Sequence, residues 1–116
     1  MMNYRPGEIA VVPFPFIDRP VKKVRPALVL SHNPDGDRDT YLILAMITSA
    51  KRSRWKSDVF IQDWKAAGLK AESLVRWKVF TIESALVTGK RGMLSERDFE
   101  SVKSSLSGIL PLQHPS

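Results

Sequence analysis

The sequence contains no cysteine among its 116 residues. This absence excludes disulfide bonds, thiolate zinc sites and a cysteine nucleophile. No stretch approaches the roughly 20 apolar residues that a membrane-spanning helix needs. The first residues, MMNYRPGEI, also lack the apolar run of a signal peptide. We therefore expect a cytoplasmic protein that does not associate with a membrane.

The motifs of several large enzyme classes are also missing. There is no P-loop and no GxGxxG, GxSxG or HExxH pattern. Only two histidines are present, one in the C-terminal tail (His114) and one at the entry to a turn (His32), so a catalytic histidine pair is not expected. The alternating aspartates at 35, 37 and 39 resemble a calcium loop, but Met46 stands where that loop needs glutamate. We expect neither a metal ion nor a cofactor.

Composition and charge favour one basic globular domain over residues 1–116. Hydrophobic residues make up 43% of the chain and charged residues 26%, as in soluble globular proteins. The net charge is +6 and the sequence pI is near 9.9. This excess of positive charge favours an anionic partner, either nucleic acid or an acidic protein segment. A basic surface with no such partner is the alternative.

Most of the chain is expected to form short strands. The segments rich in β-branched and apolar residues are EIAVVPF (8–14), ALVLS (27–31), TYLILAMITS (40–49), DVFI (58–61) and SLVRWKVFTI (73–82). Three prolines predict a loop over 13–24. Composition predicts turns at 32–39 and 50–57, and one helical turn over 62–69 that Gly68 closes. In the segment 73–82, alternation puts Leu74, Arg76, Lys78 and Phe80 on one face.

The end of the chain changes to helical spacing. Ser95 is a good N-cap, with Asp98 three residues later. Apolar residues then recur at positions 99, 102, 106 and 109. We expect a closing helix over about 95–109 and a loose tail over 111–116. Several short strands with one helix predict a mostly β fold, in which an antiparallel sheet curls toward a small barrel.

Three stretches carry residues suited to phosphate or nucleic acid. In VKKVRPALVL, Lys22, Lys23 and Arg25 precede a buried strand, and the guanidinium fork of Arg25 fits a phosphate; a strand-edge charge that discourages aggregation is the alternative. Thr48 and Ser49 end the longest apolar segment and could bind a phosphate oxygen or satisfy turn amides. The third stretch surrounds Trp55 with the cations Lys51, Arg52, Arg54 and Lys56, a pattern that suits single-stranded nucleic acid or a solvated loop.

Taken in order, these segments resemble the PemK/MazF family of toxin–antitoxin systems. The resemblance is carried by GEIAVVPFPFID (7–18), KVRPALVLS (23–31), ITS (47–49), DVFI with AGL (58–69), SLVRWKVFTI (73–82) and GMLSERDFESV (92–102). It implies a small SH3-like barrel of the CcdB-like type with a C-terminal helix, forming a homodimer. It also implies an mRNA interferase, an endoribonuclease that cleaves single-stranded RNA at specific sequences without a metal ion or cofactor. The implied products carry 2′,3′-cyclic phosphate and 5′-hydroxyl ends, and the implied partners are a cognate antitoxin and, only through the antitoxin complex, operator DNA.

The resemblance also assigns roles to single residues. The arginine of the family's RP motif falls on Arg25, which would stabilise charge on the phosphorane, and the threonine of its TS motif falls on Thr48, which would hold a phosphate oxygen. Some members carry an aspartate near the position of Lys78, so a carboxylate base from this strand is not expected. Asp18 is a possible substitute or a loop cap. Arg76 either binds RNA or braces its strand.

Two other functions stay open at this point. The chain could be a catalytically inactive module of the same fold that binds nucleic acid or antitoxin. It could also be a purely structural dimer with a basic face, which would bind RNA weakly and with little salt dependence. The loop over 19–24 lacks the glycine and serine often found in the family, so the family's cut-site preference does not transfer.

Overall fold

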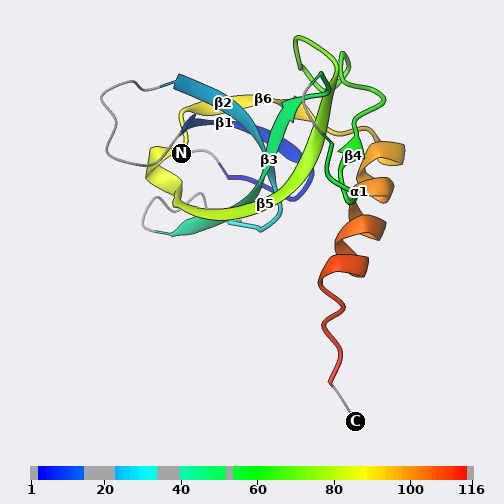
Figure 1. The fold of residues 1–116 in the computed structure, drawn as a ribbon. Coiled ribbons are helices and arrows are strands. Elements are labelled where there is room, and N and C mark those ends of the chain that lie inside the picture. The colour runs from blue at the N-terminus through cyan, green and yellow to red at the C-terminus, as the bar shows by residue number, and fades with distance from the viewer. Residues whose placement is uncertain (1–2, 15–22, 34–39, 52–53, 115–116) are drawn as a thin grey trace.

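The computed structural model describes residues 3–14, 23–33, 40–51 and 54–114. Six antiparallel strands form one sheet, in the order β4-β5-β3-β2-β1-β6. The strands are β1 (Glu8–Phe14), β2 (Lys23–Val29), β3 (Tyr41–Ser49), β4 (Val59–Phe60), β5 (Ser73–Glu83) and β6 (Gly89–Met93). A 3-10 turn, η1 (Ser84–Leu86), precedes β6, and the helix α1 (Glu96–Ile109) follows it. The sheet curls into a half-barrel, and α1 lies at its β4 side (Figure 1). The mostly β fold with a C-terminal helix, predicted from the sequence, is confirmed.

The predicted strands are present, but β2 starts four residues earlier than expected. Of the segment 13–24 that proline content assigned to a loop, Pro13 and Phe14 end β1 and pair with Val24 and Lys23 of β2. Pro26 is tolerated in β2 because the ladder between β2 and β3 begins only at Ala27, opposite Met46. The remainder of that predicted loop and the turn at 34–39 lie outside the described residues.

The side-chain contacts of β5 agree with the alternation expected for residues 73–82. Arg76 and Lys78 both approach the Trp55 ring, whereas Val75 and Trp77 belong to one core cluster. The pairing of β5 with β3 shifts between Ala45 and Met46, so that two residues of β5, Trp77 and Lys78, have no opposite residue. Such a bulge bends the strand and increases its local twist. The sequence did not predict β6, because GKRGM has two glycines and low β-propensity.

Both faces of the sheet contribute to a hydrophobic core. One cluster includes Ile9, Leu28 and Ile47 and continues onto α1 through Val102. A second cluster on the other face contains alternate residues of the same strands, including Val12, Val29 and Leu44. Because neighbouring residues of one strand enter different clusters, the strands are apolar on both sides, as their nearly continuous apolar sequence suggests. No helix among the described residues is long and apolar enough to cross a membrane.

The turn after β4 lies close to the far edge strand β6. Gly68 has a φ of +84°, in the left-handed region that glycine adopts readily. A Cβ added at Gly68 would lie 2.5 Å from the backbone oxygen of Arg91, and one added at Gly92 would lie 2.4 Å from the oxygen of Ala67. The two backbones therefore approach as closely as they do only because both positions lack a side chain. The prediction that Gly68 closes one helical turn is confirmed by its φ and by the bond from the Leu69 N–H to Trp64.

Candidate functional site

A cavity opens where β2 and β3 separate. Their hydrogen-bonded register ends at the pair Ala27 and Met46, and continuing it would place Arg25 opposite Thr48. The strands diverge there instead, and the space between them forms a cavity of about 190 Å³. Its lining residues are Arg25, Pro26, Ile47, Thr48, Ser49, Leu69, Lys70, Ala71, Glu72, Ser73 and Arg91. Two residues that the sequence singled out separately, 25 and 48, therefore face one site.

Each of these two residues is held by its strand. Arg25 is exposed, and its backbone pairs with Val12 of β1. Thr48 is half-buried and pairs with Leu74 of β5. The Thr48 hydroxyl makes no hydrogen bond to any described residue, whereas the neighbouring Ser49 hydroxyl accepts a bond of 3.3 Å from the Lys51 N–H. A permanent cation and an available hydroxyl on rigid elements are suited to hold one anionic oxygen-rich group.

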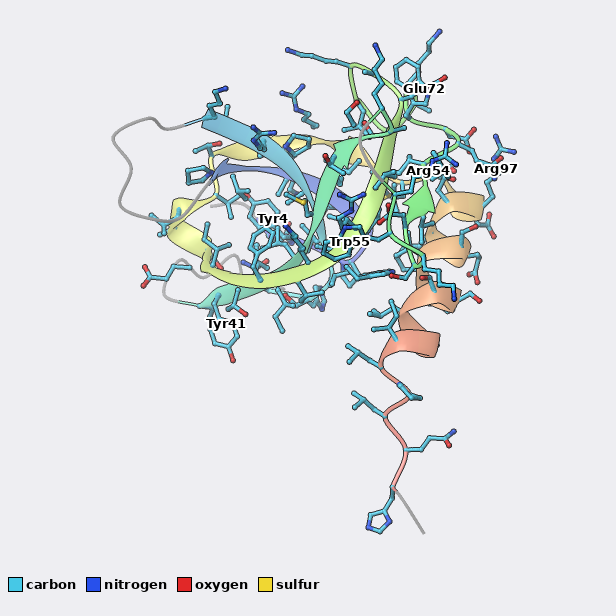
Figure 2. The ribbon with its side chains drawn as sticks, viewed as in Figure 1. Tyr4, Tyr41, Arg54, Trp55, Glu72 and Arg97 are labelled. Atoms are coloured by element: carbon cyan, nitrogen blue, oxygen red, sulfur yellow. The ribbon has the colours of Figure 1, made fainter. Side chains whose placement is uncertain are left out.

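The cavity carries more positive charge than the sequence predicted. Lys70 and Arg91 line it together with Arg25, and Glu72 supplies one carboxylate. Glu72 lies at the end of the sheet where β5 begins (Figure 2). Sequence reasoning missed these three residues because the segment containing Arg91 was not predicted as a strand, and because the helical turn predicted over 62–69 left residues 70–72 without an assignment. The one available signal was the basic pair in GKRG beside glycines.

A second polar cluster surrounds Arg76 and Trp55. The Arg76 side chain is 9% exposed and contacts Asp58 through two bonds, Nε to Oδ1 at 3.1 Å and Nη2 to Oδ2 at 2.8 Å. The hydrogen bond from Arg76 is the main cause that lowers the pKa of Asp58 below its ordinary value. The same pairing raises the pKa of Arg76. This geometry favours the bracing role of Arg76 over direct RNA binding.

Trp55 is the exposed part of this second cluster. The residue is 43% exposed. The centre of its ring lies 4.9 Å from the Arg76 guanidinium and 5.4 Å from the Lys78 ammonium. Arg54 lies 4.5 Å from the Phe60 ring of β4, beside Trp55 in the chain (Figure 2). Cations over aromatic rings hold those rings in place. An exposed ring held in this way is suited to stack on a flat ligand.

The remaining predicted residues lie apart from the cavity or outside the described residues. Lys23 is exposed at the start of β2, and Lys51 is exposed just after β3. Lys78 faces Trp55 and does not line the cavity. Lys22, Arg52 and Asp18 lie outside the described residues. Within the described part of the chain, no group of three or more His, Cys, Asp or Glu side chains is placed to hold a metal ion.

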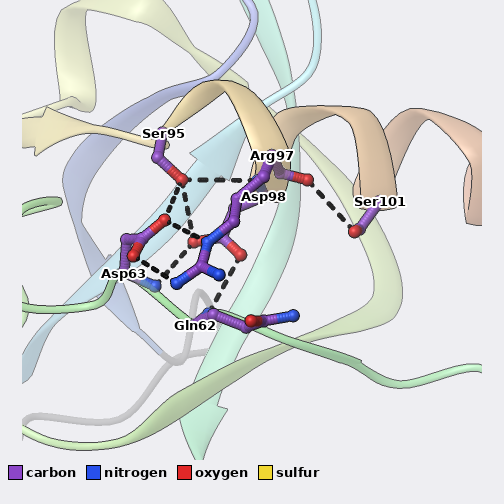
Figure 3. A network of polar contacts seen from close by, with 6 residues as sticks. All are labelled: Gln62, Asp63, Ser95, Arg97, Asp98 and Ser101. Atoms are coloured by element: carbon purple, nitrogen blue, oxygen red, sulfur yellow. Dashed lines mark hydrogen bonds and ion pairs between the residues drawn. The ribbon is translucent and has the colours of Figure 1, made fainter.

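The first turn of α1 anchors the start of the segment whose later residues, 69–73, line the cavity. Asp98 is 1% exposed, and its carboxylate accepts the backbone N–H groups of Gln62 at 2.9 Å and Asp63 at 2.8 Å (Figure 3). Ser95 caps the helix as the sequence predicts, accepting from the Asp98 N–H, and its hydroxyl donates to Asp63. Arg97 pairs with Asp63 at 2.7 Å. The bond from Arg97, and next that from Ser95, lower the pKa of Asp63 to about 2.

Comparison with known families identifies the chain. Residues 5–110 match the family described as PemK-like, MazF-like toxin of type II toxin-antitoxin system. The chain belongs to this family. The match covers both strands of the diverging pair and the whole of α1, so the cavity lies within the family's own domain. The comparison with curated proteins gives no match.

Solved structures of low sequence identity share this fold. The Mycobacterium tuberculosis toxin MazF-mt6 has a TM-score of 0.69 and 21% identity, covering 95% of this chain and 100% of that one. MazF from Deinococcus radiodurans has a TM-score of 0.71 and 16% identity, covering 97% and 100%. An endoribonuclease in complex with its cognate antitoxin, from a mycobacterial species, has a TM-score of 0.69 and 13% identity, covering 95% and 97%. These likenesses establish the MazF-type fold of this member of the family.

Proposed function

We propose that this protein is the toxin of a type II toxin–antitoxin pair and cleaves single-stranded messenger RNA at specific sequences without a metal ion. The observation that carries this proposal is the meeting of Arg25 and Thr48 in one cavity, where β2 and β3 diverge. Membership of the PemK-like, MazF-like toxin family supports it. So does the description of a similarly folded mycobacterial protein as an endoribonuclease.

In the proposed reaction, the RNA supplies its own nucleophile. The 2′-oxygen attacks the adjacent phosphorus and loses its proton, and the bond from phosphorus to the 5′-oxygen breaks as that oxygen gains a proton. The products are a 2′,3′-cyclic phosphate and a 5′-hydroxyl. Arg25 stabilises the negative charge that builds on the phosphorane, while the Thr48 hydroxyl holds a non-bridging oxygen. Electrostatic stabilisation of this kind contributes several kcal/mol in other enzymes, roughly 2.7–4 for one oxyanion donor.

The exposed cations and Trp55 extend the site along the RNA. Lys23 and Lys51 continue the positive charge from the cavity, and Ser49 lies on its lining. Arg54 and Trp55 form a second contact, in which the indole stacks on a base while the charge attracts the backbone. Lys22 and Arg52 belong to the same proposal by sequence. Lys78 and Arg76 act in it through Trp55, whose ring they hold.

The partners follow from the family. We infer a cognate antitoxin as the protein partner, because MazF from Deinococcus radiodurans has been solved with MazE and has a TM-score of 0.71 to this chain. The excess positive charge of this chain fits an acidic antitoxin segment. A homodimer in the cytoplasm, and contact with operator DNA only through the antitoxin complex, complete the proposal.

Cleavage of a long single-stranded RNA in EDTA tests the proposal directly. Purified protein should produce discrete cuts whose ends carry cyclic phosphate and 5′-hydroxyl. Arg25→Ala should lower the cleavage rate by on the order of 100-fold or more, since it removes the charge nearest the reacting phosphate. Arg5→Ala, which removes one exposed arginine outside the cavity, is the matched control.

Two outcomes would contradict the proposal. Full activity of the Arg25→Ala variant would remove Arg25 from the mechanism. No cleavage of several diverse RNAs by folded protein would instead favour the inactive binding module. In that second case, RNA binding without cleavage should still weaken as salt rises.

A further inference from the structure

Arg91 is an arginine of the cavity that the sequence did not single out. It lies in β6, on the opposite side of β1 from β2 in the sheet order, yet it lines the same cavity as Arg25 and Thr48. It reaches the cavity because the curl of the sheet brings β6 against the turn after β4. The cavity therefore has an arginine on each of two walls that are distant in sequence.

The position of Arg91 is fixed by its backbone. The carbonyl of Arg91 lies where a side chain at Gly68 would clash, and Gly92 packs against the carbonyl of Ala67 in the same way. These contacts hold β6 against the segment 67–72, whose residues 69–72 form part of the cavity lining. An arginine whose backbone is already fixed loses less conformational entropy when it binds a ligand, and this favours affinity.

One donor of the Arg91 side chain has no acceptor within the described part of the chain. This donor is the Nε–H, which is buried. Arg76 and Arg97, by contrast, each form two bonds to an aspartate. Buried donors in native proteins nearly always have a partner, so one without it indicates an unfilled acceptor position. The other charged groups lining the cavity are Arg25, Lys70 and Glu72, which leaves an excess of positive charge for an anion to neutralise.

We propose that Arg91 is a second phosphate-binding arginine of this site, whose guanidinium holds a non-bridging oxygen of the RNA phosphate while Arg25 holds the same phosphate from β2. The identity of the anion as RNA rests on the proposed function. The phosphate chemistry rests on the unpartnered Nε–H and the positive cavity. A planar guanidinium binds phosphate oxygens through a fork that lysine cannot reproduce. Arg91 thus contributes geometry as well as charge.

Binding and cleavage are measured together on variants of the full chain. The variants are Arg91→Ala, Arg91→Lys, Arg25→Ala and the control Arg5→Ala. The ligand for binding is an RNA with a 2′-deoxy substitution at the cut site, which cannot form the cyclic phosphate. Arg91→Ala should weaken binding and slow single-turnover cleavage by on the order of 10- to 100-fold, the range for a lost charge-assisted hydrogen bond.

Arg91→Lys separates the contribution of the planar guanidinium from that of its positive charge, and Arg5→Ala is the control. Arg91→Lys should recover less than half of the lost affinity on a logarithmic scale, because it keeps the charge and loses the Nε–H. Arg5→Ala should stay within about 2-fold of the unmodified protein, since Arg5 does not line the cavity. Wild-type affinity and rate in Arg91→Ala, with Arg25→Ala inactive, would overturn the role of Arg91 and leave the proposed function standing.

A direct observation of the Nε–H removes dependence on activity and on the folding of the alanine variant. The Arg91 Nε–H signal in the ¹H–¹⁵N spectrum of the unmodified protein is assigned by its loss in Arg91→Lys. It should shift on titration with inorganic phosphate and with a 2′,3′-cyclic nucleotide. No shift, while the Arg25 signal moves, would overturn the proposal. A shift in a protein that cuts no RNA would keep the phosphate site and remove the proposed function.

Discussion

Three arginines of this protein have the same side chain and different surroundings. Arg76 is buried against Asp58, and the pairing lowers the pKa of that carboxyl. Arg25 is exposed on β2, at the point where β2 no longer pairs with β3. Arg91 has a buried Nε–H without an acceptor among the described residues. The first environment is complete without a ligand, and the other two face a cavity. Environment therefore separates a bracing arginine from candidate ligand-binding ones.

Trp55 provides a test at the level of one side chain. We expect Trp55→Ala to weaken binding of a non-cleavable RNA by about 1 kcal/mol or more, because stacking on a base contributes about 1–3 kcal/mol. Trp55→Phe keeps an aromatic face and should lose less. Fluorescence anisotropy with a labelled RNA measures both affinities. An unchanged affinity in the alanine variant would make this loop ordinary surface.

The sequence selected candidate site residues but did not predict where they meet. Arg25 and Thr48 were selected separately, since a guanidinium before a strand and a hydroxyl after one each suit a phosphate. Their meeting depends on the divergence of β2 from β3, a property of pairing between distant segments. Arg91 was not selected, because its strand has little β-propensity and forms only through pairing with β1.

At the level of elements, the contact between β6 and the turn after β4 leaves the least room for a side chain. We expect Gly92→Ala to lower the free energy of unfolding by about 1–3 kcal/mol, because its Cβ would meet a backbone oxygen that cannot move alone. Gly89→Ala, in the same strand, has nothing within 4 Å of its new Cβ. That control should stay within about 0.5 kcal/mol of the original. Urea denaturation measures both values, and equal stability of the two variants would contradict the close approach.

The sequence predicted α1 almost completely and β5 only in outline. Ser95 and the apolar spacing that follows are local signals, and local signals determine where a helix begins and which face is buried. The pairing register of β5 depends instead on a bulge opposite Ala45 and Met46, which exists only in the paired sheet. Periodicity in one segment cannot report an extra pair of residues relative to a partner strand.

At the level of the whole molecule, acid should weaken the fold through Asp58 and Asp63. Both carboxyls have a pKa below the ordinary value, and that of Asp63 is about 2. Unfolded aspartate titrates near pH 3.9, so above about pH 4 their contribution to stability is fully present. As the pH falls from about 4 toward 2, the unfolded state binds more protons and the contribution is lost.

Urea midpoints at several pH values between 6 and 2.5 measure this loss. The unmodified protein should show a steady fall below about pH 4. Arg97→Ala removes the main cause of the lowered pKa of Asp63, so its midpoint should depend less steeply on pH. Equal pH dependence of the urea midpoint in the two proteins would show that Arg97 does not lower the pKa of Asp63.

The absence of side chains at Gly68 and Gly92 has a consequence for genetics. Cells that survive expression of a toxin carry alleles that have lost its effect, and such alleles should include changes at Arg25 as well as at these two glycines. The two groups would differ in abundance, since an altered glycine separates two backbones and leaves little folded protein to detect. Immunoblots of surviving clones would thus sort a loss of chemistry from a loss of protein, and the glycine alleles would mark the contact between β6 and the turn after β4.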